Sequence, residues 1–166
     1  MIPIIRKSPN TPLGALGLGA VAGIRSMTPP ALLSRSASRG EIRGIEKTRF
    51  GFLASPRVAR LFTVLAAGEI SADKLPFSPD RTSIPGLAGR LATGALVGAA
   101  LFSADGRSGA TGGALGAASS LAASYLSFYL RTGTQERFEL PNPALGIVED
   151  AIALSVGLLS LRNAKG

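Results

Sequence analysis

Residues 108–130 read SGATGGALGAASSLAASYLSFYL and contain no charged side chain. At about 1.5 Å per residue, a helix of this length can cross a hydrocarbon core of about 30 Å. We therefore predict a membrane-spanning helix here.

Four more apolar segments flank this stretch, at residues 8–34, 55–70, 84–104 and 143–161. The whole chain of 166 residues is 46% apolar and only 17% charged, with a mean hydropathy of +0.31. Soluble domains carry about 25% charged residues. We predict an all-α fold, a small polytopic helical membrane bundle with about five apolar segments, in which residues 1–166 form a single integral membrane domain.

The first apolar segment carries Arg25 as its only charge, and Thr28, Pro29 and Pro30 follow closely. Consecutive prolines remove two backbone donors and push the preceding residue out of the helical region. We therefore predict that this segment is broken near Arg25 to Pro30, with Thr28, Pro29 and Pro30 as the helix-break residues. A secretory signal peptide is the alternative for this segment, because Arg6 and Lys7 precede an apolar run.

Residues 35–60 hold a cluster of basic side chains: Arg35, Arg39, Arg43, Lys47, Arg49, Arg57 and Arg60. Clustered Lys and Arg between apolar segments indicate a basic cytoplasmic loop. Within it we expect a short amphipathic helix on the lipid surface, with an apolar face formed by Ile42, Ile45, Phe50 and Leu53. The net charge of +8 also suits a nucleic-acid binder, but no aromatic stacking platform accompanies the loop, so we expect no nucleic-acid partner.

Charge counting leaves the path of the first segment and the orientation of the N-terminus open. If all five segments cross, ten basic residues lie on the cytoplasmic side and six on the other. If the first segment enters and leaves on one side, the split becomes twelve to four. The second arrangement satisfies the charge rule better.

Small residues recur at intervals of four in three of the segments. Because lipid is as apolar as leucine, membrane helices associate through close contacts that small residues permit. The expected helix-packing positions are Gly19, Gly23, Gly94, Gly98, Gly112 and Gly116. Arg90 lies four residues before Gly94, which places it on the small-residue face.

Several ionisable residues lie in or beside the apolar segments. Charges in a membrane interior are costly unless they pair or reach water. We predict an internal cluster in which two arginines neutralise some of the carboxylates; its members are Arg25, Glu69, Asp73, Arg90, Glu149 and Asp150. The alternative is that these side chains lie near helix ends, where they reach the interface or cap a terminus.

The segment Gly23, Ile24, Arg25, Ser26, Met27, Thr28, Pro29 resembles a signature of the uncharacterised bacterial membrane-protein family catalogued as DUF4126. Three further stretches are similar to that family: Glu69 with Ala72, Asp73, Lys74, Leu75, Pro76, Pro79, Asp80, Arg81 and Thr82; Pro85, Gly86, Leu87, Gly94 and Ala95; and Val148, Glu149, Asp150 and Ala151. The resemblance implies a multi-pass membrane protein and adds no substrate.

Two functions remain open. The first is a small transporter or channel-like protein, a homo-oligomer whose internal charges line a polar path. The second is a structural or assembly subunit of a larger membrane complex, held through its glycine-rich faces. The chain has neither Cys nor His, so we expect no enzyme activity, no metal site and no cofactor. The expected location is the bacterial inner (cytoplasmic) membrane.

Overall fold

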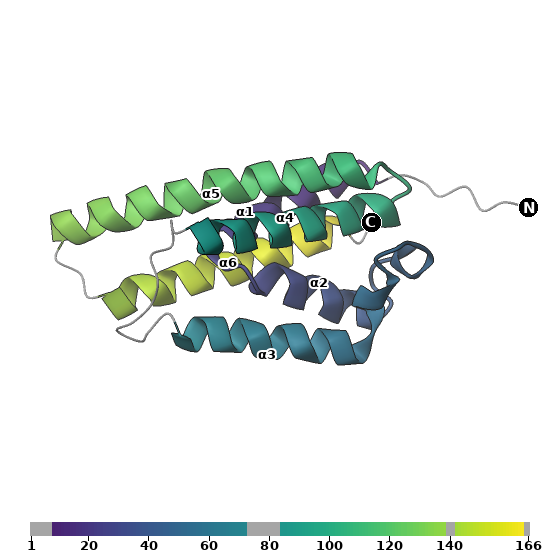
Figure 1. Cartoon of the computed structure of the whole chain (residues 1–166), viewed down its shortest axis with the longest axis horizontal. Coiled ribbons are helices and arrows are strands. Elements are labelled where there is room, and N and C mark those ends of the chain that lie inside the picture. Colours follow the sequence, from purple (N-terminus) through teal and green to yellow (C-terminus); the bar gives the residue numbers. More distant parts are fainter. Residues whose placement is uncertain (1–7, 73–83, 139–141, 165–166) are drawn as a thin grey trace, which may run out of the picture.

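A computed structural model of the chain describes residues 8–72, 84–138 and 142–164. These residues form six α-helices and two short 3₁₀ helices, and no strand, so the all-α prediction is confirmed for them. The helices lie along the long axis of the molecule (Figure 1). In chain order they are α1 (Thr11–Ile24), α2 (Thr28–Ser38), η1 (Ile45–Lys47), η2 (Gly51–Ala54), α3 (Pro56–Ala72), α4 (Ile84–Ala104), α5 (Gly109–Phe138) and α6 (Asn142–Ala164).

Helices α1, α4 and α5 meet at glycines. A Cβ atom built at Gly94 would lie 2.7 Å from the carbonyl oxygen of Gly116, and one at Gly19 would lie 2.5 Å from the same oxygen. Gly98 likewise contacts the backbone of Gly112. The absence of side chains at these positions lets the helix backbones touch, which is the close approach that small residues make possible.

The first apolar segment returns to the end of the bundle at which it starts. The backbone N–H of Ser8, just before α1, donates to Asp105 in the turn between α4 and α5, at 2.8 Å. Gly44, which follows α2, lies against the carbonyl oxygen of Ala104 at the end of α4. Helices α1 and α2 therefore form a hairpin whose two open ends lie at the α4–α5 turn, called the turn end below (Figure 1).

The basic segment 35–60 folds onto the turn end, and the prediction of an amphipathic helix on a lipid surface is wrong. Its apolar residues Ile42, Ile45 and Leu53 are buried in the main hydrophobic core together with Leu101 and Phe102 of α4. Between the end of α2 and the start of α3, the segment forms only the single turns η1 and η2. Burial of these side chains inside the protein removes the apolar face that would have met lipid, while the seven basic residues are all exposed.

Large apolar side chains remain exposed on the outer faces of three helices. They are Leu61, Val64 and Leu65 of α3, Leu121, Tyr125, Leu126, Phe128, Tyr129 and Leu130 of α5, and Ile147, Val148, Ile152, Leu154, Leu158 and Leu159 of α6. By length and composition, α4 is the one helix among the described residues that is long and apolar enough to cross a membrane. Helix α1 is apolar but shorter.

Candidate functional site

The break between α1 and α2 lies at Arg25, Ser26 and Met27, within the predicted range Arg25 to Pro30 but before the prolines. Arg25 has an extended backbone with φ −137° and ψ 106°, which ends α1. The predicted break residues Thr28, Pro29 and Pro30 instead form the first turn of α2. Proline fits there because the first N–H groups of a helix have no partner within the helix, so losing them costs nothing. The prolines start the second helix, and the residues before them make the break.

Arg25 points from this break toward α6. Its Nε donates to Oδ1 of Asp150 at 2.7 Å, and the two side chains are 3% and 16% exposed. A buried guanidinium is tolerated when a carboxylate neutralises it at hydrogen-bond distance. The structure therefore brings together two of the six predicted cluster residues, from segments 125 residues apart in the chain.

The side chain of Glu69, near the end of α3, binds backbone N–H groups of the same break. One carboxylate oxygen accepts from the backbone N–H and the hydroxyl of Ser26, both at 2.8 Å, and the other accepts from the N–H of Met27 at 2.8 Å. These N–H groups precede α2, where the helix dipole favours negative charge. Glu69 thus acts as the N-terminal cap that α2 lacks in its own sequence, since Met27 has no capping side chain.

Glu149 pairs with a residue outside the predicted cluster. Its carboxylate accepts from Nη1 of Arg131 at 3.3 Å and from the hydroxyl of Ser127 at 3.2 Å, both on α5. Arg131 lies in the helix because α5 continues to Phe138, beyond the uncharged stretch that ends at Leu130. The sequence prediction ended this helix at Leu130, before the charge of Arg131, and so it missed Arg131 as a partner of Glu149.

Arg90 is 9% exposed and lies in α4, at the level of the break. Its carbonyl oxygen accepts from the hydroxyl of Ser120 at 2.9 Å, and the hydroxyl of Ser124, one turn further along α5, donates to the carbonyl of Gly23 at 3.1 Å. Asp73, the remaining predicted member, lies outside the described residues. The cluster of all six residues therefore stays a prediction, of which the structure gives the Arg25–Asp150 pair.

We call the group Arg25, Ser26, Met27, Glu69 and Asp150 the polar centre. It joins two helices to the α1–α2 break: α3 through Glu69 and α6 through Asp150. One buried guanidinium between two partly buried carboxylates can exchange partners, bind an ion or pass a proton. Among the described residues, no group of three or more acidic side chains is placed to hold a metal ion.

All six predicted helix-packing glycines lie against other helices. Besides the contacts given above, a Cβ atom at Gly23 would meet the backbone of α5 at Ser120 and Ser124. These contacts lie within the chain and on the turn-end side of the polar centre. Through these contacts α1, α4 and α5 pack closely together, next to the break.

Comparison with curated proteins and with solved structures found no match. A family model described as "Domain of unknown function (DUF4126)" matches residues 13–164, which include every residue of the polar centre. Because the match covers nearly the whole chain, the protein belongs to the DUF4126 family.

Proposed function

We propose that this protein is a multi-pass protein of the bacterial inner membrane in which α3, α4, α5 and α6 cross the bilayer. The exposed apolar faces of α3, α5 and α6 support this proposal, because soluble monomers rarely expose apolar patches of such extent. Nine basic side chains gather at or near the turn end, namely Arg107, Arg162 and the seven of segment 35–60. The positive-inside rule then assigns the turn end to the cytoplasmic side.

In this arrangement the α1–α2 hairpin enters from the cytoplasmic side and returns to it. Helix α1 has 14 residues, which span about 21 Å at about 1.5 Å per residue. The break would therefore lie deep in a hydrocarbon core of about 30 Å. Non-helical backbone at that depth is tolerated only where protein covers it or where it lines a cavity.

The function that this geometry supports best is that of a small transporter or channel-like protein, working as a homo-oligomer, with the polar centre on the path of the transported ion or solute. The single observation that carries it is the meeting of two half-helices at Arg25, held by Glu69 and Asp150. Broken helices whose ends face charged groups are a common way to build a transport site at mid-membrane.

The test is a flux assay on the purified protein in liposomes, with trapped dyes reporting protons, K⁺ and Cl⁻ in separate experiments. We expect Asp150→Asn to change the flux of at least one of these ions. The matched control is Asp105→Asn, which removes the carboxylate of another Arg–Asp pair, also joined at 2.7 Å, at the turn end. Circular dichroism and gel filtration establish that both variants are folded.

Equal flux in wild type, Asp150→Asn and protein-free liposomes for all three ions would refute a role in ion transport. Arg25→Lys is the second variant, because it keeps a positive charge at the break while losing the planar donor set of arginine. An altered flux in Arg25→Lys together with a normal flux in Asp105→Asn would tie the path to the polar centre.

The second candidate function is a structural or assembly subunit of a larger membrane complex. The observation that favours it is the broad apolar surface of α5 and α6. Since the six glycines contact residues of the same chain, a partner would meet these apolar faces instead. Purification from native membranes in mild detergent separates the two functions: a stoichiometric partner protein favours the subunit, and a homo-oligomer alone counts against it.

A further inference from the structure

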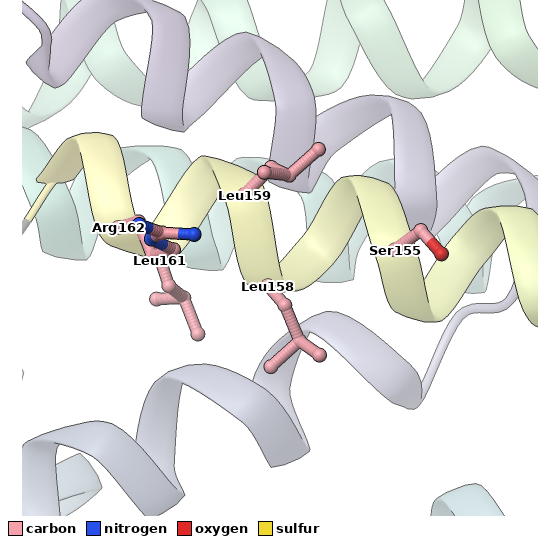
Figure 2. Close-up of a pocket in the computed structure, with 5 residues that line it drawn as sticks. All are labelled: Ser155, Leu158, Leu159, Leu161 and Arg162. Atoms are coloured by element: carbon pink, nitrogen blue, oxygen red, sulfur yellow. The ribbon is translucent and has the colours of Figure 1, made fainter.

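An open groove of about 510 Å³ lies along the last two turns of α6 (Figure 2). It is lined by Ser155, Leu158, Leu159, Leu161 and Arg162. Leu158 and Leu159 are 54% and 56% exposed, whereas Leu161 is buried. The groove is therefore lined by leucines along most of its length and by the positive charge of Arg162 near the end of α6.

Arg162 differs in its pairing from Arg107 and Arg131. Arg107 pairs with Asp105, and Arg131 pairs with Glu149. Arg162 is exposed in the last turn of α6, and none of the ion pairs that the structure gives for the described residues includes it. Its charge is available to a ligand that lies in the groove.

The groove opens at the turn end. A Cβ atom at Gly14, near the start of α1, would lie 3.1 Å from Ala164, just beyond Arg162. In the membrane arrangement proposed above, Arg162 stands at the cytoplasmic interface, and Leu158 and Leu159 face the hydrocarbon region just inside it. A ligand that matches both parts has an anionic group at the interface and a long apolar chain below it.

We propose that this groove binds one anionic phospholipid, with its phosphate at Arg162 and an acyl chain along Leu158 and Leu159. The proposal rests on the membrane location of the proposed function, and it is independent of any transport activity. Arginine binds phosphate through two parallel N–H donors, and a basic side chain near the cytoplasmic surface of a membrane attracts anionic lipids. A zwitterionic lipid brings no net charge to Arg162, and a soluble anion leaves the leucines uncovered.

The experiment counts lipids retained by the purified protein in native mass spectrometry. Phosphatidylglycerol and phosphatidylcholine with identical acyl chains are offered separately. We expect the wild type to retain one more phosphatidylglycerol than phosphatidylcholine. Arg162→Gln should lose this difference and Arg162→Lys should keep most of it.

The matched control is Arg49→Gln, which removes the same charge from the turn end at a position that does not line the groove. Equal losses in Arg162→Gln and Arg49→Gln, or equal retention of the two lipids by the wild type, would overturn the lipid site alone. A dimer held together through this groove in place of lipid would also overturn it. A protein that stays monodisperse without detergent and retains neither lipid would instead overturn the membrane location.

Discussion

Replacing Gly94 by alanine puts a methyl group at the contact between α4 and α5. The new Cβ would lie 2.7 Å from the carbonyl oxygen of Gly116 and 2.8 Å from Cβ of Ser120. Ordinary contact begins at 3.4 Å, so the methyl group is too close by about 0.7 Å. The nearest obstacle is helix backbone, which cannot rotate away as a side chain can, so α4 and α5 must separate.

Two effects of opposite sign set the size of the change in unfolding free energy. Overfilling a close contact costs about 1–3 kcal/mol. Alanine in place of glycine within a helix gains about 0.5–1 kcal/mol. We expect Gly94→Ala to lower the free energy of unfolding by about 1–2 kcal/mol.

The matched control is Gly89→Ala on the same helix, where a Cβ would meet nothing within 4 Å. Only the helix-propensity gain applies there, so Gly89→Ala should raise the free energy of unfolding by about 0.5–1 kcal/mol. Circular dichroism during unfolding in detergent measures both variants. If Gly94→Ala is as stable as Gly89→Ala, the close glycine contact between α4 and α5 is refuted.

Three further substitutions test the break and the turn end by the same unfolding measurement. Asp150→Ala removes a carboxylate that accepts from the buried guanidinium of Arg25 and should lower the free energy of unfolding by about 1.5–3 kcal/mol; with Arg25→Met added, the total should fall below the sum of the single effects, and additivity would argue against the pair. Glu69→Ala removes the acceptor of two backbone N–H groups at the break and should cost about 2–3 kcal/mol, with Glu69→Gln milder because its amide oxygen still accepts; equal costs would contradict this capping role. Gly44→Ala should destabilise more than Gly40→Ala, because both glycines have positive φ but only a Cβ at Gly44 meets a backbone oxygen, at 2.5 Å; the reverse order would speak against the fold of segment 35–60.

The sequence predicted the helices well where hydropathy and helix length agree. The predicted segment 84–104 coincides with α4, because an apolar run bounded by polar links is also one helix. The predicted end at Leu130 was too early for α5, since a charge ends an apolar run without ending a helix. That difference concealed Arg131 as the partner of Glu149.

Which charges meet could be predicted only in part. The periodicity of α4 placed Arg90 on the glycine face, and it is buried. Helical spacing gives the face of a residue but not the neighbouring helix, so the choice of Asp150 for Arg25 required the tertiary arrangement. The partners of Glu69 are mainly backbone N–H groups, which every residue except proline carries, so the sequence does not single them out. The one indication was Met27, which is a poor N-cap residue.

The central claim is that the first apolar segment enters and leaves the bilayer on one side, with Arg25 at its turning point. Because the chain contains no native Cys, single cysteines at Ser8, Ser38, Ser108 and Thr134 can be labelled by an impermeant reagent from each side of oriented membranes. We expect the first three to react from the same side, since they lie before α1, at the end of α2 and in the α4–α5 turn, and Thr134 to react from the other. Labelling of Ser8 and Ser38 from opposite sides would show a crossing segment and contradict the account.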